Sequence, residues 1–134
     1  MRILLVGAGG VGSAAVKILA RRAFFEHCVV TDYDADRAQR ALPTQDPRFS
    51  AAQIDASSAS SVTDLCREHH ITHVFNAVDP RFVMPIFHGA FAADAHYLDM
   101  AMSLSRPHAT EPYAKVGVKL GDEQFAETEK WSAA

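Results

Sequence analysis

Residues 1–22 read MRILLVGAGGVGSAAVKILARR, and this stretch decides the fold. It opens with an apolar run at residues 3–6 and breaks into a glycine-rich turn at residues 7–12. Apolar residues then recur at helical spacing over residues 14–19, with Lys17, Arg21 and Arg22 away from them. The stretch therefore predicts a strand, a tight turn and a helix in direct succession.

The turn carries the spacing G-x-G-x-x-G, which gives each glycine a separate role. Gly7 allows the sharp turn out of the strand, Gly9 lets the backbone approach a pyrophosphate, and Gly12 lets the helix pack closely on the strand. The helix N-terminus offers free N–H groups and a positive dipole end to phosphates. We therefore predict a dinucleotide site at Gly7, Gly9, Gly10, Val11 and Gly12. The alternative is a glycine-rich turn without a ligand.

Asp32 closes a second apolar run at residues 28–31 and follows Gly12 by twenty residues. A carboxylate in this position binds the adenosine ribose hydroxyls, and it repels the 2′-phosphate of NADP. We therefore predict NAD as the cofactor, with NADP as the alternative. Asp34 and Asp36 follow, and they are placed to cap the next helix.

Length and composition narrow the class of protein. A chain of 134 residues is one domain, and its net charge of −3 gives no reason to expect a nucleic-acid partner. No apolar run approaches the ~20 residues that span a bilayer, and the start lacks a secretory pattern, so we expect a cytoplasmic protein without a membrane partner. Cys28 and Cys66 are expected to be buried thiols.

Strand and helix patterns alternate along the remaining chain, which is typical of a parallel sheet with helices on both faces. Right-handed crossovers then give a doubly wound α/β (Rossmann) fold with strand order 3-2-1-4-5. We expect the sixth strand and a substrate domain to lie beyond residue 134, so that residues 1–134 are a dinucleotide-binding fragment. The later strands are expected at 49–54, 73–78 and 97–100, and the later helices at 36–42, 60–70, 80–93 and 121–134.

Ligands of such sheets bind beyond the carboxyl ends of the strands, where the strand order reverses. Asn76 and Ala77 follow the fourth strand: Asn76 is a candidate for the ribose or nicotinamide, and Ala77 leaves room for the cofactor. Asp55 follows the third strand on the adenine side, and Asp99 ends the fifth strand, level with a substrate. The alternative for each polar residue is a local cap or turn hydrogen bond.

The histidines do not form a convincing metal motif. His69 and His70 end a predicted helix and His73 begins a strand, so they need not converge, and no H-E-x-x-H occurs. The G-V-G-S of the glycine turn is not a nucleophile elbow. We therefore expect neither a metal site nor a Ser-His-Asp or Cys-His arrangement.

The segments MRILLVGAGGVGSAAVKIL, VVTDYDADRAQ, QIDASSASSVTDL, HVFNAVDP and HYLDMA together resemble the amino-terminal nucleotide domain of saccharopine dehydrogenase-like oxidoreductases. That family includes saccharopine, carboxynorspermidine and lysine 6-dehydrogenases. The resemblance implies an NAD(P)-dependent enzyme of a pathway such as lysine metabolism, which makes or breaks a secondary amine by hydride transfer with an imine. It leaves the substrate, the catalytic residues and self-association undetermined.

Two other classes share parts of this pattern. NAD-sensing domains of potassium channels and transporters resemble the glycine turn, the acidic end of the second strand and the I-D-A sequence. Adenylating enzymes of the ubiquitin-activating type resemble G-A-G-G-V-G-S and D-x-D, although their zinc cysteines are missing here. Binding of NAD, NADP and ATP would separate the readings.

Overall fold

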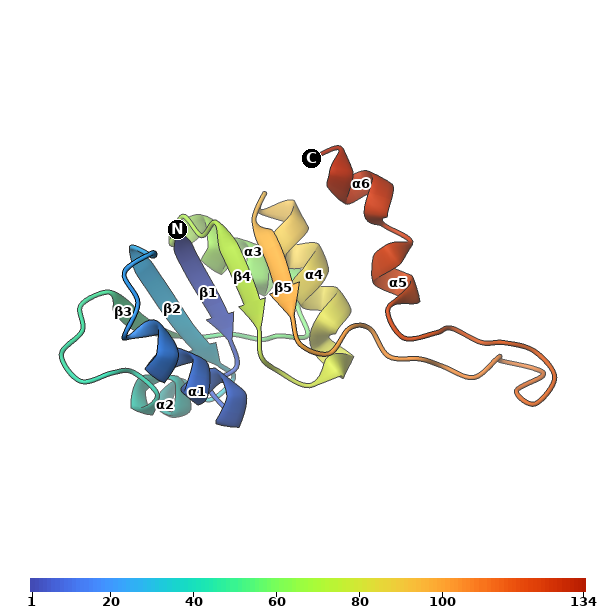
Figure 1. The fold of residues 1–134 in the computed structure, drawn as a ribbon, viewed down its shortest axis with the longest axis horizontal. Helices are drawn as coiled ribbons and strands as arrows, with labels where there is room; N and C mark the ends of the chain where they lie inside the picture. The colour runs from blue at the N-terminus through green and yellow to red at the C-terminus, as the bar shows by residue number, and fades with distance from the viewer.

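A computed structural model describes all residues 1–134 and shows a five-stranded sheet in which every strand pair is parallel. The strand order is β3-β2-β1-β4-β5, which confirms the predicted doubly wound topology (Figure 1). The order reverses between β1 and β4, so a crevice forms at the carboxyl ends of these two strands. The strands are β1 (Arg2–Val6), β2 (His27–Asp32), β3 (Phe49–Gln53), β4 (His73–Asn76) and β5 (His96–Asp99).

Helices cover both faces of the sheet, because alternate residues of each strand point to opposite sides. On one face, Ile3 and Leu5 of β1 pack with Val16 of α1 (Gly10–Leu19). On the other face, Leu4 and Val6 share a core with α3 (Ala59–Glu68) and α4 (Val83–Ala92). The short α2 (Ala35–Arg40) connects β2 to β3. Continuous apolar strands are expected where both faces are buried.

Hydrogen bonds in the turns determine where several helices and strands begin or end. Asp34 caps α2 by accepting the backbone N–H of Arg37, as predicted. The strand expected at 73–78 ends at Asn76, because the Asn76 Oδ1 accepts the N–H of Val78 and starts a turn. The following helix opens as a 3₁₀ turn, η1 (Pro80–Phe82), before α4.

The predicted continuous helix over 121–134 is wrong. The structure has two short helices there, α5 (Asp122–Phe125) and α6 (Thr128–Ser132). The Thr128 hydroxyl donates to the Phe125 carbonyl, which takes that acceptor away from a continuous helix. Consequently Phe125 and Trp131 do not share a face: Phe125 is exposed, whereas Trp131 packs on Phe87 of α4.

Figure 1 shows the segment between β5 and α5 extending away from the sheet before the chain returns beside α4. This segment has no helix or strand, and one antiparallel bridge joins Arg106 to Val118. No helix in the structure combines the length and apolar character needed to cross a bilayer.

Candidate functional site

The glycine turn between β1 and α1 is fixed by two close backbone approaches. Gly7 has φ of +102°, a conformation that residues with a Cβ rarely adopt. A Cβ on Gly12 would lie 1.8 Å from the Gly7 carbonyl oxygen, so the first turn of α1 packs directly against the end of β1. Ala77 completes this contact, with its methyl 3.9 Å from the same Cβ position. These residues shape the turn as the sequence predicts.

Gly9 and Gly10 have a different environment. A Cβ built on either glycine would meet no atom within 4 Å, so both positions face open space. No side chain caps α1, and the backbone N–H groups of Gly9, Gly10, Val11 and Gly12 donate to no atom of the chain. Unpaired N–H groups at a helix N-terminus are a site for phosphate. The turn therefore fits a dinucleotide pyrophosphate.

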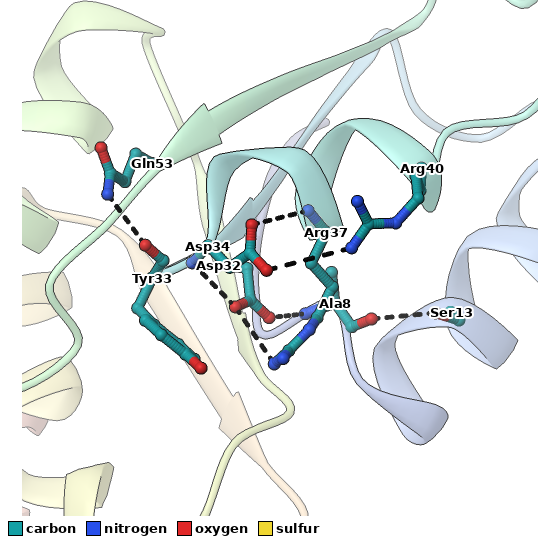
Figure 2. Close-up of polar contacts among 8 residues, drawn as sticks. All are labelled: Ala8, Ser13, Asp32, Tyr33, Asp34, Arg37, Arg40 and Gln53. Atoms are coloured by element: carbon teal, nitrogen blue, oxygen red, sulfur yellow. Dashed lines mark hydrogen bonds and ion pairs between the residues drawn. The ribbon is translucent and has the colours of Figure 1, made fainter.

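Asp32 lies at the end of β2 and reaches the glycine turn. Its side chain is almost fully buried, yet each carboxylate oxygen has a donor (Figure 2). Oδ2 accepts the N–H of Ala8 at 3.0 Å, and Oδ1 accepts the N–H of Asp34 at 3.1 Å. The carboxylate thus holds the glycine turn and the start of the next helix together at the place where an adenosine ribose is expected.

Arg37 places a positive charge beside this carboxylate. Its Nη1 lies 3.5 Å from Asp32 Oδ1, and its guanidinium stands over the ring of Tyr33 at 5.3 Å. The neighbouring Asp32 raises the pKa of Arg37. Arg40 pairs more loosely with Asp34, at 3.9 Å. The ribose end of the site therefore combines the buried carboxylate of Asp32 with the positive charges of Arg37 and Arg40 (Figure 2).

A small depression of about 140 Å³ lies between the ends of β1, β2 and β3, and Asp32, Tyr33, Ile54 and Asp55 line part of it. This is the adenine side of the predicted site. Asp55 itself accepts hydrogen bonds from the N–H and hydroxyl of Ser57, at 2.9 and 2.6 Å, which hold its pKa below the usual range. Asp55 thus borders the depression. It also makes the local turn hydrogen bonds that were the alternative to a ligand contact.

Asn76 and Asp99 also form hydrogen bonds within the chain. Asn76 is 2% exposed, its Nδ2 donates to the Tyr97 hydroxyl at 2.9 Å, and burial raises the pKa of that tyrosine. Asp99 accepts the N–H groups of Ala101 and Met102 through Oδ1, and the Gln124 amide through Oδ2. These polar groups shape the nicotinamide side of the crevice, and a direct contact between Asn76 and a ligand stays a prediction.

Three features of the site were not identified from the sequence: the N–H of Ala8, the position of Arg37 over Tyr33, and the Asn76–Tyr97 pair. One of these features, the position of Arg37 over Tyr33, left a signal in the sequence: Arg37 falls one helical turn after Tyr33, and both residues follow Asp32.

The three histidines considered as metal ligands belong to different elements. His69 ends α3, His70 follows it, and His73 begins β4 beside His96. No group of three His, Cys, Asp or Glu side chains is arranged to hold a metal ion.

Comparison of the sequence with models of known protein families gives a match over almost the whole chain. The family model described as the saccharopine dehydrogenase NADP binding domain matches residues 3–134. No curated protein matches the chain in sequence.

Solved structures share the fold at low sequence identity. Apo saccharopine dehydrogenase (L-Glu forming) from Saccharomyces cerevisiae has a TM-score of 0.62 and 16% identity, and the match covers 73% of this chain and 21% of that one. UDP-glucose 4-epimerase from Thermus thermophilus, in complex with NAD, has a TM-score of 0.67 and 15% identity, with 98% and 52% covered. The enzyme WbmG from Bordetella bronchiseptica, also in complex with NAD, has a TM-score of 0.62 and 18% identity, with 100% and 50% covered. The chain thus spans about a fifth of the dehydrogenase and about half of the other two proteins.

Proposed function

This chain belongs to the family of saccharopine dehydrogenase NADP-binding domains, and we propose that it serves an oxidoreductase that transfers a hydride between NAD(P) and a secondary amine or imine. The observation that carries the proposal is the glycine turn, where unpaired N–H groups at the start of α1 face open space. The buried Asp32 carboxylate lies next to that turn, at the end of β2.

The residues present fit an NAD(P) molecule, which supplies the hydride chemistry when it is bound. The N–H groups from Gly9 to Gly12 would bind the pyrophosphate, and Asp32 would accept the adenosine ribose hydroxyls. Tyr33 and Ile54 would border the adenine. Asn76, fixed by Tyr97, would orient the nicotinamide half of the crevice.

We propose that NAD is preferred to NADP. At a separation of about 4 Å and an effective dielectric near 20, a unit charge on the 2′-phosphate would be repelled by the Asp32 carboxylate by roughly 4 kcal/mol, before solvent screening. Arg37 lies 3.5 Å from Asp32 and offsets part of this repulsion. The preference is therefore expected to be moderate, with measurable binding of NADP.

The proposed substrate is a secondary amine derived from an amino acid or polyamine, such as saccharopine or carboxynorspermidine. Family membership over residues 3–134 supports this assignment. Hydride transfer needs the reacting carbon within roughly 3 to 3.5 Å of the nicotinamide. We propose that a substrate domain provides this positioning in the complete enzyme, and that residues 1–134 bind the cofactor without turnover.

The test is a binding panel on the 134-residue protein. Calorimetry and thermal shift should show binding of NAD, weaker binding of NADP and no binding of ATP. ATP binding without NAD binding would overturn the proposal in favour of an adenylating enzyme. Incubation with NAD and saccharopine, lysine or carboxynorspermidine should give no reduced cofactor. Steady reduction would show that these residues already contain a complete active site.

A further inference from the structure

A polar hollow of about 360 Å³ lies at the carboxyl end of the sheet, on the side of β4 and β5. Its walls come from three segments: η1 with the start of α4, the residues just past β5, and α5. Because η1 follows β4, two of these walls continue from the carboxyl ends of neighbouring strands (Figure 1). Ligands of doubly wound sheets bind at these ends. The hollow is therefore at the end of the sheet where a substrate would meet the cofactor.

Hydrogen bonds from one glutamine hold two walls of the hollow together. Gln124 Oε1 accepts the N–H of Ser103 at 2.8 Å, and its Nε2 donates to Asp99 Oδ2 at 2.8 Å. The Ser103 carbonyl accepts the N–H of Gly121 at 2.9 Å. The backbone just past β5 is thus attached to α5 through both its N–H and its C=O groups, and this attachment gives the hollow a defined shape.

The hydroxyl of Ser103 has no hydrogen-bond partner in the chain. Ser103 is 1% exposed, and it lines the hollow. A buried hydroxyl without a partner is unfavourable and rare in folded proteins. Because the N–H and C=O groups of Ser103 are already bonded, the hydroxyl is the free polar group of this residue. A polar ligand in the hollow would supply the missing partner.

Charged groups of both signs line the hollow. Arg81 and Arg106 bring two guanidinium groups, and Glu123 brings a carboxylate. Arg81 donates to Asp79 through Nε and Nη2, which leaves its Nη1 free. Arg106 donates to Glu123 through Nη2, which leaves its Nε and Nη1 free. The side chains of Arg81 and Arg106 are 71% and 61% exposed, so these free N–H groups are open to a ligand.

Two arginines and one glutamate around one hollow fit a ligand that carries both charges. A guanidinium binds a carboxylate through parallel N–H groups, and a carboxylate binds an ammonium group through a charge-assisted hydrogen bond. A simple anion would be repelled by Glu123, and a simple cation would be repelled by both arginines. An α-amino-acid group has a carboxylate and an ammonium group on one carbon. Saccharopine, lysine and carboxynorspermidine each carry such a group.

We propose that this hollow binds the α-amino-acid group of the substrate. The carboxylate of that group accepts hydrogen bonds from Arg81, Arg106 and the Ser103 hydroxyl. The ammonium group donates to Glu123. The assignment rests on the proposed function, from which the class of substrate is taken, and it adds the residues that select an amino-acid-derived amine over a plain amine. None of these residues belongs to the predicted cofactor site, so substrate recognition and cofactor binding are separable by mutation.

NMR titration of the 134-residue protein with three small probes tests the site. L-Norvaline carries the whole α-amino-acid group, valerate lacks the ammonium group, and n-butylamine lacks the carboxylate. The shifts of the backbone amides and of the arginine Nε–H groups report where each probe binds, in the absence and presence of NAD. Norvaline should shift residues 80–84, 103–106 and 123. Its Kd should be at least about tenfold below that of valerate or butylamine, because each of these probes lacks one charge-assisted contact.

Variants of the hollow separate the contacts. Arg81→Gln and Arg106→Gln should each raise the norvaline Kd at least about tenfold, because each removes a charge-assisted contact. Ser103→Ala should raise it about threefold and keep the wild-type unfolding midpoint, because the hydroxyl has no partner in the free protein. Arg21→Gln is the matched control, since Arg21 is exposed just past α1 and lies outside the hollow. Its norvaline Kd should equal that of wild type.

The Glu123→Gln variant tests the ammonium contact, since it should weaken norvaline binding and strengthen valerate binding. Arg106→Lys replaces Arg106→Gln if that variant fails to fold, as judged by circular dichroism. Lysine keeps a positive charge beside Glu123 but lacks the planar fork, so it should also weaken norvaline binding. The proposal is overturned if norvaline shifts no residue of the hollow, or if both arginine variants bind it as wild type does.

Calorimetry of NAD on the same proteins keeps this site apart from the cofactor site. Every variant of the hollow should bind NAD as wild type does. NAD binding without norvaline binding would overturn the substrate site and leave the cofactor site standing. Norvaline binding in the hollow without any NAD binding would support the amino-acid site and reject the proposed dehydrogenase function.

Discussion

The Asp32 carboxylate accepts the backbone N–H of Ala8 at 3.0 Å and so joins the end of β2 to the glycine turn. Its second oxygen accepts the N–H of Asp34 and lies 3.5 Å from Arg37 Nη1. One buried side chain thus positions the turn and also sets the charge at the expected ribose position. Cofactor binding and cofactor choice should therefore change together when Asp32 is altered.

Replacing Asp32 with Asn removes the negative charge and keeps the size of the side chain. We expect NAD affinity to fall about tenfold, because a neutral amide accepts ribose hydrogen bonds more weakly than a carboxylate. The ratio of NAD to NADP affinity should shift toward NADP by at least about tenfold, which is about 1.4 kcal/mol of the repulsion estimated from charge and distance. Calorimetric Kd values for the two cofactors provide the measurement.

The Arg37→Gln variant is the counterpart of Asp32→Asn, because it removes the positive charge of the pair instead of the negative one. It removes the positive charge that offsets Asp32, so NADP affinity should fall by about tenfold while NAD affinity changes little. The NADP effect should shrink in high salt, because the Arg37 side chain is partly exposed to solvent. An equal loss of both cofactors in the two variants would contradict a charge-based selection at this end of the site.

Gly9→Ala and Gly12→Ala separate ligand contact from folding. A methyl group on Gly9 meets no atom of the chain, so this variant should keep the wild-type unfolding midpoint and lose NAD binding at least about 100-fold. A methyl group on Gly12 would lie 1.8 Å from the Gly7 carbonyl oxygen, so that variant should lose several kcal/mol of stability. Thermal unfolding and calorimetry on both proteins provide the comparison, and wild-type NAD affinity in Gly9→Ala would exclude the pyrophosphate cradle.

The fold was predictable because its signals are local. The apolar runs, the glycine spacing and the cap at Asp34 each depend on neighbouring residues, and together they indicated the strand order that the structure confirms. The break of the last helix was not predictable in the same way. It depends on the hydrogen bond that the Thr128 hydroxyl donates to the Phe125 carbonyl, and nothing in the apolar pattern indicates this bond.

The candidate site was predictable only in part, for a similar reason. Gly7 and Gly12 have backbone conformations and contacts that their spacing indicates. By contrast, the bond from Ala8 to Asp32 joins residues 24 apart, and the bond from Asn76 to Tyr97 joins residues 21 apart. An apolar groove lined by Ile18 of α1, Phe75 of β4 and Leu98 of β5 likewise combines distant segments, so it exists only once the chain has folded.

The two cysteines give the protein a defined response to alkaline pH. Burial raises the pKa of Cys28 and of Cys66 to about 12, whereas a thiol in an unfolded chain ionises near pH 8.5. The folded state therefore retains protons that the unfolded state loses. Their contribution to stability should be complete below about pH 8.5 and should disappear as the pH rises toward 12, by about 1.4 kcal/mol per pH unit for each thiol.

Urea unfolding at several pH values measures that slope, and a Cys28→Ala/Cys66→Ala protein is the control, since its alkaline slope should be smaller. Iodoacetamide at pH 8 should label neither thiol in native protein and both in urea, because the thiolate is the reactive form. Rapid labelling of native protein would show that the cysteines are accessible and that the alkaline response has another origin.

Trp131 attaches α6 to the rest of the molecule. Its ring centroid lies 4.6 Å from that of Phe87 and 5.2 Å from that of Phe91, both on α4. Its Nε1 is buried without a hydrogen-bond partner, which offsets part of the packing energy. Trp131→Ala should therefore cost about 2 kcal/mol, while Trp131→Phe should be within about 0.5 kcal/mol of wild type, because it keeps aromatic packing and removes the unpaired N–H.

Hydrogen exchange of the α6 amides and urea unfolding followed by circular dichroism test this pair, since Trp131 is the only tryptophan and its fluorescence is lost in both variants. Trp131→Ala should speed exchange in α6 while leaving the amides of β1 protected, because the contacts that it removes lie on α4 at one end of the domain. If Trp131→Phe were as destabilising as Trp131→Ala, the indole N–H would have to be making a favourable contact. Packing against Phe87 and Phe91 would then not be what holds α6 in place.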